Sequence, residues 1–157
     1  MTKPHASDLR KGRVSIPGQI YLVTCVTENR APLFRDFATG RKVVSALRYH
    51  EENGNAQTLA YVVMPDHLHW LLALGEKLSL SRLLASLKSY TARRIVSGGQ
   101  ALWQKGFHDH AVRSDEDMRE IARYVVANPL RAGLVKKLGD YPLWDATWLE
   151  RPLGRDN

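Results

Sequence analysis

The chain of 157 residues is long enough for one domain with a proper core and too short for two, and its 44% hydrophobic and 25% charged residues are ordinary for a globular protein. Its single cysteine excludes a disulfide framework, and no apolar run approaches transmembrane length, so we expect a cytoplasmic protein with no membrane partner. Twenty-three Lys and Arg residues against sixteen Asp and Glu residues give a net charge of +7, which favours a polyanionic partner such as nucleic acid.

The positive charge is concentrated in two parts of the chain. Residues 1–17 form a predicted basic N-terminal arm that includes Arg13. Residues 77–107 contain no acidic residue and six basic ones, namely Lys77, Arg82, Lys88, Arg93, Arg94 and Lys105. Clusters of this kind are typical of surfaces that follow a phosphate backbone, but also of plain solvated faces and termini. Both interpretations remain open at this point.

The first half of the chain predicts three strands and one helix. Residues 20–26 are rich in β-branched and aromatic residues and predict a strand. Hydrophobic residues at helical spacing predict a helix over 36–52. Strands at about 57–63 and 67–74 flank Met64-Pro65-Asp66, whose proline and aspartate favour a tight turn, so these two strands form a predicted hairpin.

The second half predicts two helices and one strand. An amphipathic helix begins at Leu80 and ends near Gly98. A fourth strand is predicted near 107–113. Ser114 with Asp117 resembles a capping box and opens a helix that runs to about Asn128. The order β-α-β-β-α-β predicts an α+β, ferredoxin-like sandwich with an antiparallel sheet and one additional helix. We expect one domain over 1–157, with a tail from about 146 to 157.

The third predicted strand contains two histidines, His67 and His69. Successive side chains of a strand alternate between its two faces, so both imidazoles point the same way. They are either structural or half of a site for a divalent transition metal. Asp66 on the preceding turn is the one nearby residue that could supply an oxygen ligand. A second pair, His108 and His110, complicates the assignment.

The last predicted helix carries Tyr124 and, four residues later, Asn128. This spacing places both side chains on one side of a helix, at the border between core and solvent. Taken alone, the pattern also fits a boundary tyrosine and an asparagine that ends a helix before Pro129.

Three segments, taken together, resemble a known family in their order and spacing. They are Val63-Met64-Pro65-Asp66-His67-Leu68-His69-Trp70, then Trp103-Gln104-x-x-Phe107-x-Asp109-His110-x-Val112-Arg113, and then Tyr124-x-x-x-Asn128-Pro129-x-x-Ala132-Gly133-Leu134-Val135. The chain is similar over about residues 13–145 to the REP-associated tyrosine transposases, a branch of the single-tyrosine HUH nucleases.

This resemblance implies a role for several residues. It implies that Tyr124 is the nucleophile and that His67, His69 and Asn128 hold a divalent metal, Mg²⁺ or Mn²⁺. It also implies that His110 borders the active site and that Arg113 contacts a phosphate. Relatives usually have an aromatic residue where this chain has His108.

The implied reaction cleaves and rejoins single-stranded DNA at hairpin-forming repeats through a 5′-phosphotyrosine link. The expected partner is single-stranded or hairpin DNA, and a monomer is favoured over a homodimer. Candidate DNA contacts are Arg13, Arg82, Lys88, Arg93, Arg94 and Arg113. Trp70, Trp103 and Tyr90 are candidates for base stacking, with a core position as the alternative. Other functions that fit are a non-catalytic hairpin-binding module, a metal-dependent hydrolytic nuclease that does not use the tyrosine, and a slow-cutting relative that binds hairpins.

Overall fold

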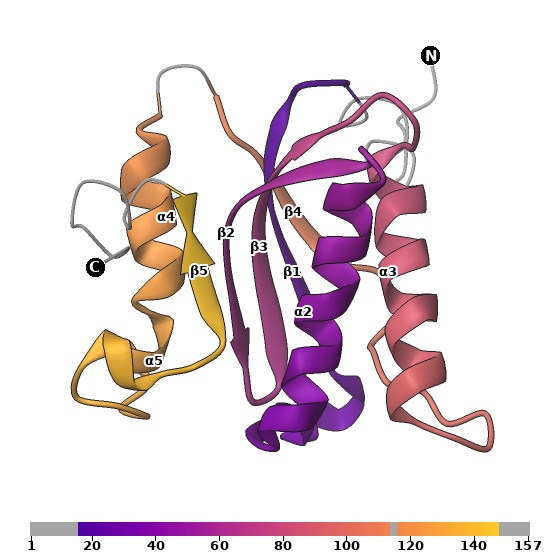
Figure 1. Ribbon diagram of the computed structural model, residues 1–157, viewed down its shortest axis with the longest axis vertical. Helices are drawn as coiled ribbons and strands as arrows, with labels where there is room; N and C mark the ends of the chain where they lie inside the picture. The colour runs from indigo at the N-terminus through magenta and orange to yellow at the C-terminus, as the bar shows by residue number, and fades with distance from the viewer. Residues whose placement is uncertain (1–15, 114–115, 148–157) are drawn as a thin grey trace, which may run out of the picture.

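The computed structural model describes residues 16–113 and 116–147. Its strands and helices, in chain order, are β1 (Ile20–Val26), α2 (Phe37–Glu52), β2 (Ala56–Met64), β3 (His67–Leu74), α3 (Leu80–Ile95), β4 (His108–Ala111), α4 (Met118–Val126), α5 (Asn128–Arg131) and β5 (Trp144–Ala146) (Figure 1). Arg13, most of the basic arm, Ser114 and most of the expected tail lie outside the described residues.

The five strands form one antiparallel sheet in the order β4-β1-β3-β2-β5. The fold is therefore α+β, as the sequence predicted. The predicted hairpin is present: β2 and β3 pair from Ala56 with Leu74 to Met64 with His67. Pro65 and Asp66 form its turn, and the carbonyl of Pro65 accepts the Phe34 amide at 3.0 Å. This contact fixes the turn that precedes the histidines.

The sheet separates two hydrophobic clusters. Alternate side chains of β1 and β3, including Tyr21, Val23 and Trp70, pack with α2 and α3. The other face, including Val62 and Leu71, packs with α4. Figure 1 shows α2 and α3 together on one side of the sheet and α4 on the other. Because α4 contacts β2, β3 and β5, it covers only part of its face and leaves the β1 and β4 side more open.

Local sequence signals set the helix boundaries. The side chain of Asp36 accepts the Thr39 amide at the start of α2, and Ser79 accepts the Arg82 amide at the start of α3. Asp117 caps α4 by accepting the amides of the second and third residues of the helix, so the helix begins after Asp117 and not after Ser114 of the predicted capping box. These bonds satisfy backbone amides that have no partner inside the helix.

The structure differs from the sequence prediction in two further places. The predicted last helix does not run unbroken to Asn128: α4 ends at Val126 and α5 begins at Asn128. Pro129 has no amide to donate to the Val125 carbonyl, which accepts the Asn128 side-chain amide at 3.4 Å instead. The second difference is β5, which pairs with β2 where the sequence predicted only the approach to a tail.

Candidate active site

His67 and His69 lie on β3 and point to the sheet face that α4 partly covers. Their ring centroids are 4.7 Å apart and the rings meet edge to face. Leu68 and Trp70 point to the opposite face, where both are fully buried. The two histidines are half-buried, so they are neither part of the core nor fully solvated.

Each histidine uses its Nδ1 atom for a contact inside the protein. His67 Nδ1 lies 2.7 Å from Asp66 Oδ1, and His69 Nδ1 lies 2.7 Å from Thr24 Oγ1. The β1–β3 register places Thr24 directly opposite His69. With the proton on Nδ1, each Nε2 has its lone pair free, and a hydrogen bond at Nδ1 is how carboxylates and other acceptors orient metal-binding histidines. The donor set therefore fits a divalent transition metal.

Asp66 orients a histidine and also pairs with a cation. Its second oxygen, Oδ2, lies 3.1 Å from Arg30 Nη1. Burial alone would raise the pKa of Asp66, but the hydrogen bonds with His67 and Arg30 and their charges hold it below its ordinary value. Asp66 is therefore an anion with both oxygens engaged, which suits it to fix the His67 ring.

His69 is neutral at neutral pH. Burial, followed by the charges of His67 and Arg131, lowers the pKa of His69 to about 4. A neutral imidazole is the form that binds a metal. Within residues 16–113 and 116–147, no group of three or more His, Cys, Asp or Glu side chains is arranged to hold a metal ion.

Tyr124 lies on α4 and is 60% exposed. Its side chain lines an open cleft of about 550 Å³ between α4 and the β1–β4 edge, together with Leu22, His110 and Glu116. Leu22 is two residues from Thr24 on the same face of β1, so the cleft adjoins the histidine pair. The side chain of Tyr124 is therefore accessible to a large ligand.

His110 shares this cleft with Tyr124. Its Nε2 lies 3.0 Å from Glu116 Oε2, and the Arg113 amide donates to Glu116 Oε1 at 2.7 Å. These contacts hold the pKa of the Glu116 carboxyl below its ordinary value. The hydrogen bond from the Arg113 backbone amide contributes most, and the hydrogen bond with His110 comes next. His108 pairs with Thr24 across the β1–β4 ladder, so it also lies on the histidine face, separated from His69 by β1.

Asn128 begins α5 and is separated from Val126, the last residue of α4, by Ala127 alone. Its amide nitrogen donates to the Val125 carbonyl, which leaves the amide oxygen as the atom able to bind a metal. Arg131 lies three residues further along α5, so the two side chains are neighbours on this turn. The guanidinium Cζ of Arg131 is 3.9 Å from the ring centroid of Tyr124.

Sequence reasoning missed Thr24 and Arg131. Thr24 carries no local signal, because its contact with His69 depends on a strand register between residues 45 apart in the chain. The spacing of seven residues between Tyr124 and Arg131 would place both on one side of an unbroken helix, but the helix is interrupted between them, so their contact follows from how α5 is placed after α4.

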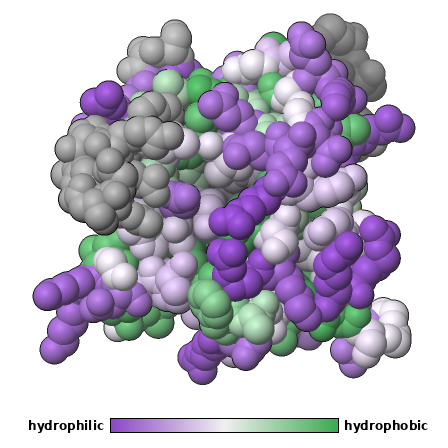
Figure 2. Space-filling view, in the orientation of Figure 1, coloured by the Kyte–Doolittle hydropathy of each residue, from purple (hydrophilic) through white to green (hydrophobic). Residues whose placement is uncertain are grey.

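The basic residues of α3 belong to the opposite layer of the fold. Arg82, Arg93 and Arg94 are exposed, and hydrophilic side chains dominate the view over α2 and α3 (Figure 2). Lys88 instead donates to the backbone carbonyls of Gln104 and Gly106 and so holds that loop.

The proposed stacking residues have different positions. Trp70 and Trp103 are buried, and each donates its indole N–H to a threonine hydroxyl, so the core interpretation is confirmed for both. Tyr90 stacks on Tyr49 at 5.3 Å between centroids, with Arg94 at 3.5 Å from its ring.

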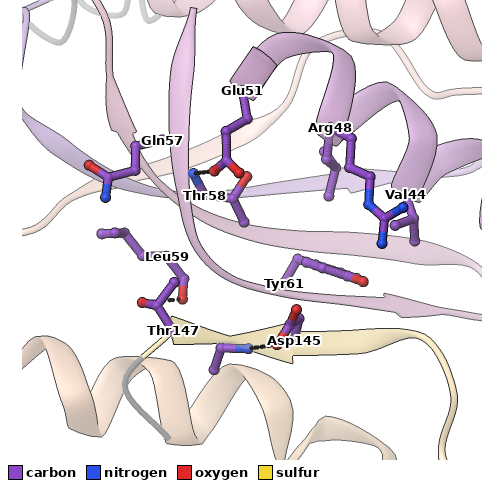
Figure 3. Close-up of a pocket in the computed structure, with 11 residues that line it drawn as sticks. Val44, Arg48, Glu51, Gln57, Thr58, Leu59, Tyr61, Asp145 and Thr147 are labelled. Carbon is purple, nitrogen blue, oxygen red and sulfur yellow. Dashed lines mark hydrogen bonds between the residues drawn. The ribbon is translucent and has the colours of Figure 1, made fainter. Parts of the chain in front are cut away.

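A second cavity, of about 290 Å³, lies between α2 and the β2–β5 edge (Figure 3). Glu51 accepts the Thr58 amide and Asp145 accepts the Ala146 amide, so backbone groups engage both carboxylates. It contains neither the histidines nor Tyr124. We therefore assign the candidate site to the α4 face.

The chain belongs to the IS200-like transposase family, because the family model described as "Transposase IS200 like" matches residues 16–128. It is 35% identical over 85 residues to the REP-associated tyrosine transposase of Escherichia coli K12, a match that covers 53% of this chain and half of that protein's length. This chain is also 26% identical over 139 residues to a protein of Haemophilus influenzae with the same family name, and that match covers 80% of this chain and 78% of the relative. The sequence resemblance to REP-associated tyrosine transposases is therefore confirmed.

A solved structure of a REP-associated tyrosine transposase bound to a REP hairpin has the same fold. Its TM-score is 0.75 at 24% identity, and the match covers 99% of this chain and 87% of that one. In the described part of this chain, no helix is long and apolar enough to cross a membrane.

Proposed function

We propose that this protein is a metal-dependent transposase that cleaves and rejoins single-stranded DNA beside hairpin-forming repeats. Tyr124 is the proposed nucleophile, and the proposed intermediate is a 5′-phosphotyrosine link. The observation that carries the proposal is the position of Tyr124 on the same side of the sheet as His67 and His69, whose Nδ1 atoms are engaged and whose Nε2 atoms are free.

The fold supports this proposal through its topology. The first four strands have the sheet order β4-β1-β3-β2, with α2 and α3 on one face. We classify this unit as a ferredoxin-like sandwich, to which β5 adds an edge strand and α4 adds the tyrosine-bearing helix. Such a unit leaves one sheet face available for a site, and the histidines of this chain lie on that face.

His67, His69 and the amide oxygen of Asn128 are the proposed ligands of Mg²⁺ or Mn²⁺. When bound, the metal would polarise the phosphate and stabilise the charge that develops on its oxygens. Thr24 and Asp66 keep the two rings oriented through their Nδ1 contacts. Burial keeps His69 neutral, so a proton does not compete for its lone pair at neutral pH.

The proposed chemical step is a transesterification. The Tyr124 oxygen attacks the phosphorus, the bond between phosphorus and the 3′ oxygen breaks, and the phenolic proton is passed to that leaving oxygen. An ordinary phenol has a pKa near 10, so proton removal needs assistance. His110, held by Glu116 in the Tyr124 cleft, is our candidate for this transfer. Attack by a 3′-hydroxyl on the phosphotyrosine reverses the step and rejoins DNA without another energy source.

Hairpin DNA is the proposed substrate. The REP-associated relative of known structure is bound to a REP hairpin, and this chain has a net charge of +7. Exposed arginines on α3, and Arg113 beside the cleft, are the proposed contacts to the DNA backbone. We further propose that the protein acts as a monomer, which light scattering in solution would test.

A covalent capture experiment tests the proposal. Full-length protein is incubated with Mn²⁺ and a pool of DNA hairpins that carry randomised single-stranded tails, and DNA that stays attached after denaturation is sequenced. We expect a metal-dependent adduct that disappears in Tyr124→Phe. Arg123→Gln, an exposed neighbour on α4, is the matched control and should retain the adduct. Cleavage that persists in Tyr124→Phe would indicate a hydrolytic nuclease, and binding without cleavage under either metal would indicate a binding module.

A further inference from the structure

Arg131 connects the two halves of the candidate site. It is the last residue of α5, and its guanidinium carbon lies 3.9 Å from the centroid of the Tyr124 ring. A guanidinium over an aromatic face is attracted by the negative charge of the π-system. This contact restrains the side chain of Tyr124, which is 60% exposed.

Arg131 also shares a helical turn with Asn128. The short helix α5 begins at Asn128 and ends at Arg131, three residues later, so the side chains of the two residues are neighbours. The guanidinium is therefore held against the ring of the proposed nucleophile by the same turn that carries one proposed metal ligand.

Arg131 has no carboxylate partner among residues 16–113 and 116–147, where the ion pairs involve Arg30, His67 and His110 instead. It is also exposed. A guanidinium presents paired N–H donors that match the oxygens of a phosphate, and it stays charged at all relevant pH values. An exposed cation beside the proposed nucleophile, with no carboxylate partner among the described residues, is suited to receive an anionic substrate group.

We propose that Arg131 binds the scissile phosphate of the DNA, with its N–H groups donating to the non-bridging oxygens while its planar face holds the Tyr124 ring. This inference rests on the proposed function, since it takes Tyr124 as the nucleophile. Arg131 thereby aligns the phosphorus with the phenolic oxygen and stabilises the charge that builds up on the phosphate during attack. A lysine at this position would keep the charge but lose both the paired donors and the planar face.

A charge-deletion cycle on the DNA and the protein tests this contact. The scissile phosphate is first mapped from the adduct of the unmodified protein. Binding is then measured by fluorescence anisotropy in the inactive Tyr124→Phe background, which keeps an aromatic ring under Arg131. Two DNAs are compared at fixed Mn²⁺, one with the normal phosphate and one with an uncharged methylphosphonate at the scissile position. The proteins compared carry Arg131, Arg131→Gln or the control Arg123→Gln.

We expect the protein with Arg131 to prefer the normal DNA over the methylphosphonate DNA, and this preference should be about tenfold larger than the preference of Arg131→Gln. The reason is that the methylphosphonate removes the charge-assisted contact only from a protein that still has Arg131. Arg123→Gln should keep the full preference, and both variants should melt like the parent protein. In the active background, Arg131→Gln should slow adduct formation at saturating DNA by about 100-fold.

Other outcomes separate the two proposals. If the unmodified protein forms an adduct but the preference for the charged phosphate is the same with and without Arg131, the Arg131 inference is wrong and the proposed function stands. If no adduct forms at Tyr124, the proposed function fails and the inference falls with it.

Discussion

Acidification should weaken the fold through His69. The pKa of this histidine is lowered from 6.5 to about 4, mainly by burial and then by the charges of His67 and Arg131. Between these two pH values the unfolded chain binds a proton that the folded chain does not. The stability contributed by neutral His69 is therefore fully present above pH 6.5 and is lost as the pH falls to 4. At about 1.36 kcal/mol for each pH unit, this interval corresponds to about 3 kcal/mol.

Urea unfolding of the metal-free protein at several pH values from 7 to 4 would measure this loss. The reference is His69→Asn, which keeps a hydrogen-bonding group beside Thr24 but does not titrate in this range. All other ionisable groups are present in both proteins, so the difference between the two pH profiles reports on His69 together with its charge interactions with His67 and Arg131. We expect the natural protein to lose about 3 kcal/mol more than the variant. Profiles that run parallel within about 0.5 kcal/mol, close to the error of such extrapolations, would refute the reasoning.

Three further predictions address the metal, the packing and the DNA surface. Thr24→Val should weaken Mn²⁺ binding by about 10- to 100-fold in calorimetry, and unchanged affinity would show that Thr24 does not orient His69. Gly75→Ala should lower the free energy of unfolding measured in urea by about 1–3 kcal/mol, because a Cβ there would meet backbone atoms, including Asn55 O at 2.9 Å. Gly139→Ala is the matched control and should be neutral, because a Cβ at Gly139 would meet no neighbouring group within 4 Å. Replacing Arg93 and Arg94 by Gln should lower the slope of log affinity against log salt by about 1.4 if both contact single-stranded DNA, and an unchanged slope would remove them from the interface.

The main elements of the fold could be predicted from the sequence because their signals are local. β-Branched and aromatic residues define β1, and the Pro65-Asp66 turn between two apolar segments defines the hairpin of β2 and β3. Helical spacing with a capping side chain defines α2 and α3. The strand β5 has three residues and no such pattern. It exists because the chain returns to pair with β2, and the Tyr141 hydroxyl donates to the Val63 carbonyl just before it. That is a tertiary contact, which local patterns do not contain.

The same distinction applies to the candidate site. The common face of His67 and His69 follows from strand alternation, and the Asp66 contact follows from its place beside His67. The Thr24 contact depends on the β1–β3 register. The sequence also contained a signal for the separation of α4 from α5, because Pro129 has no amide to donate to the Val125 carbonyl. The prediction instead followed the helical spacing of the apolar residues and extended the helix to Asn128.

The most direct test of the proposed function is to identify the protein atom that becomes attached to DNA. Adducts formed with Mn²⁺ and a cleaved hairpin are digested with protease and nuclease, and the modified peptide is sequenced by mass spectrometry. The account predicts a 5′-phosphonucleotide on Tyr124 and a free 3′-hydroxyl on the released strand. A phosphonucleotide on any other residue, or cleavage that leaves no nucleotide on the protein, would contradict it.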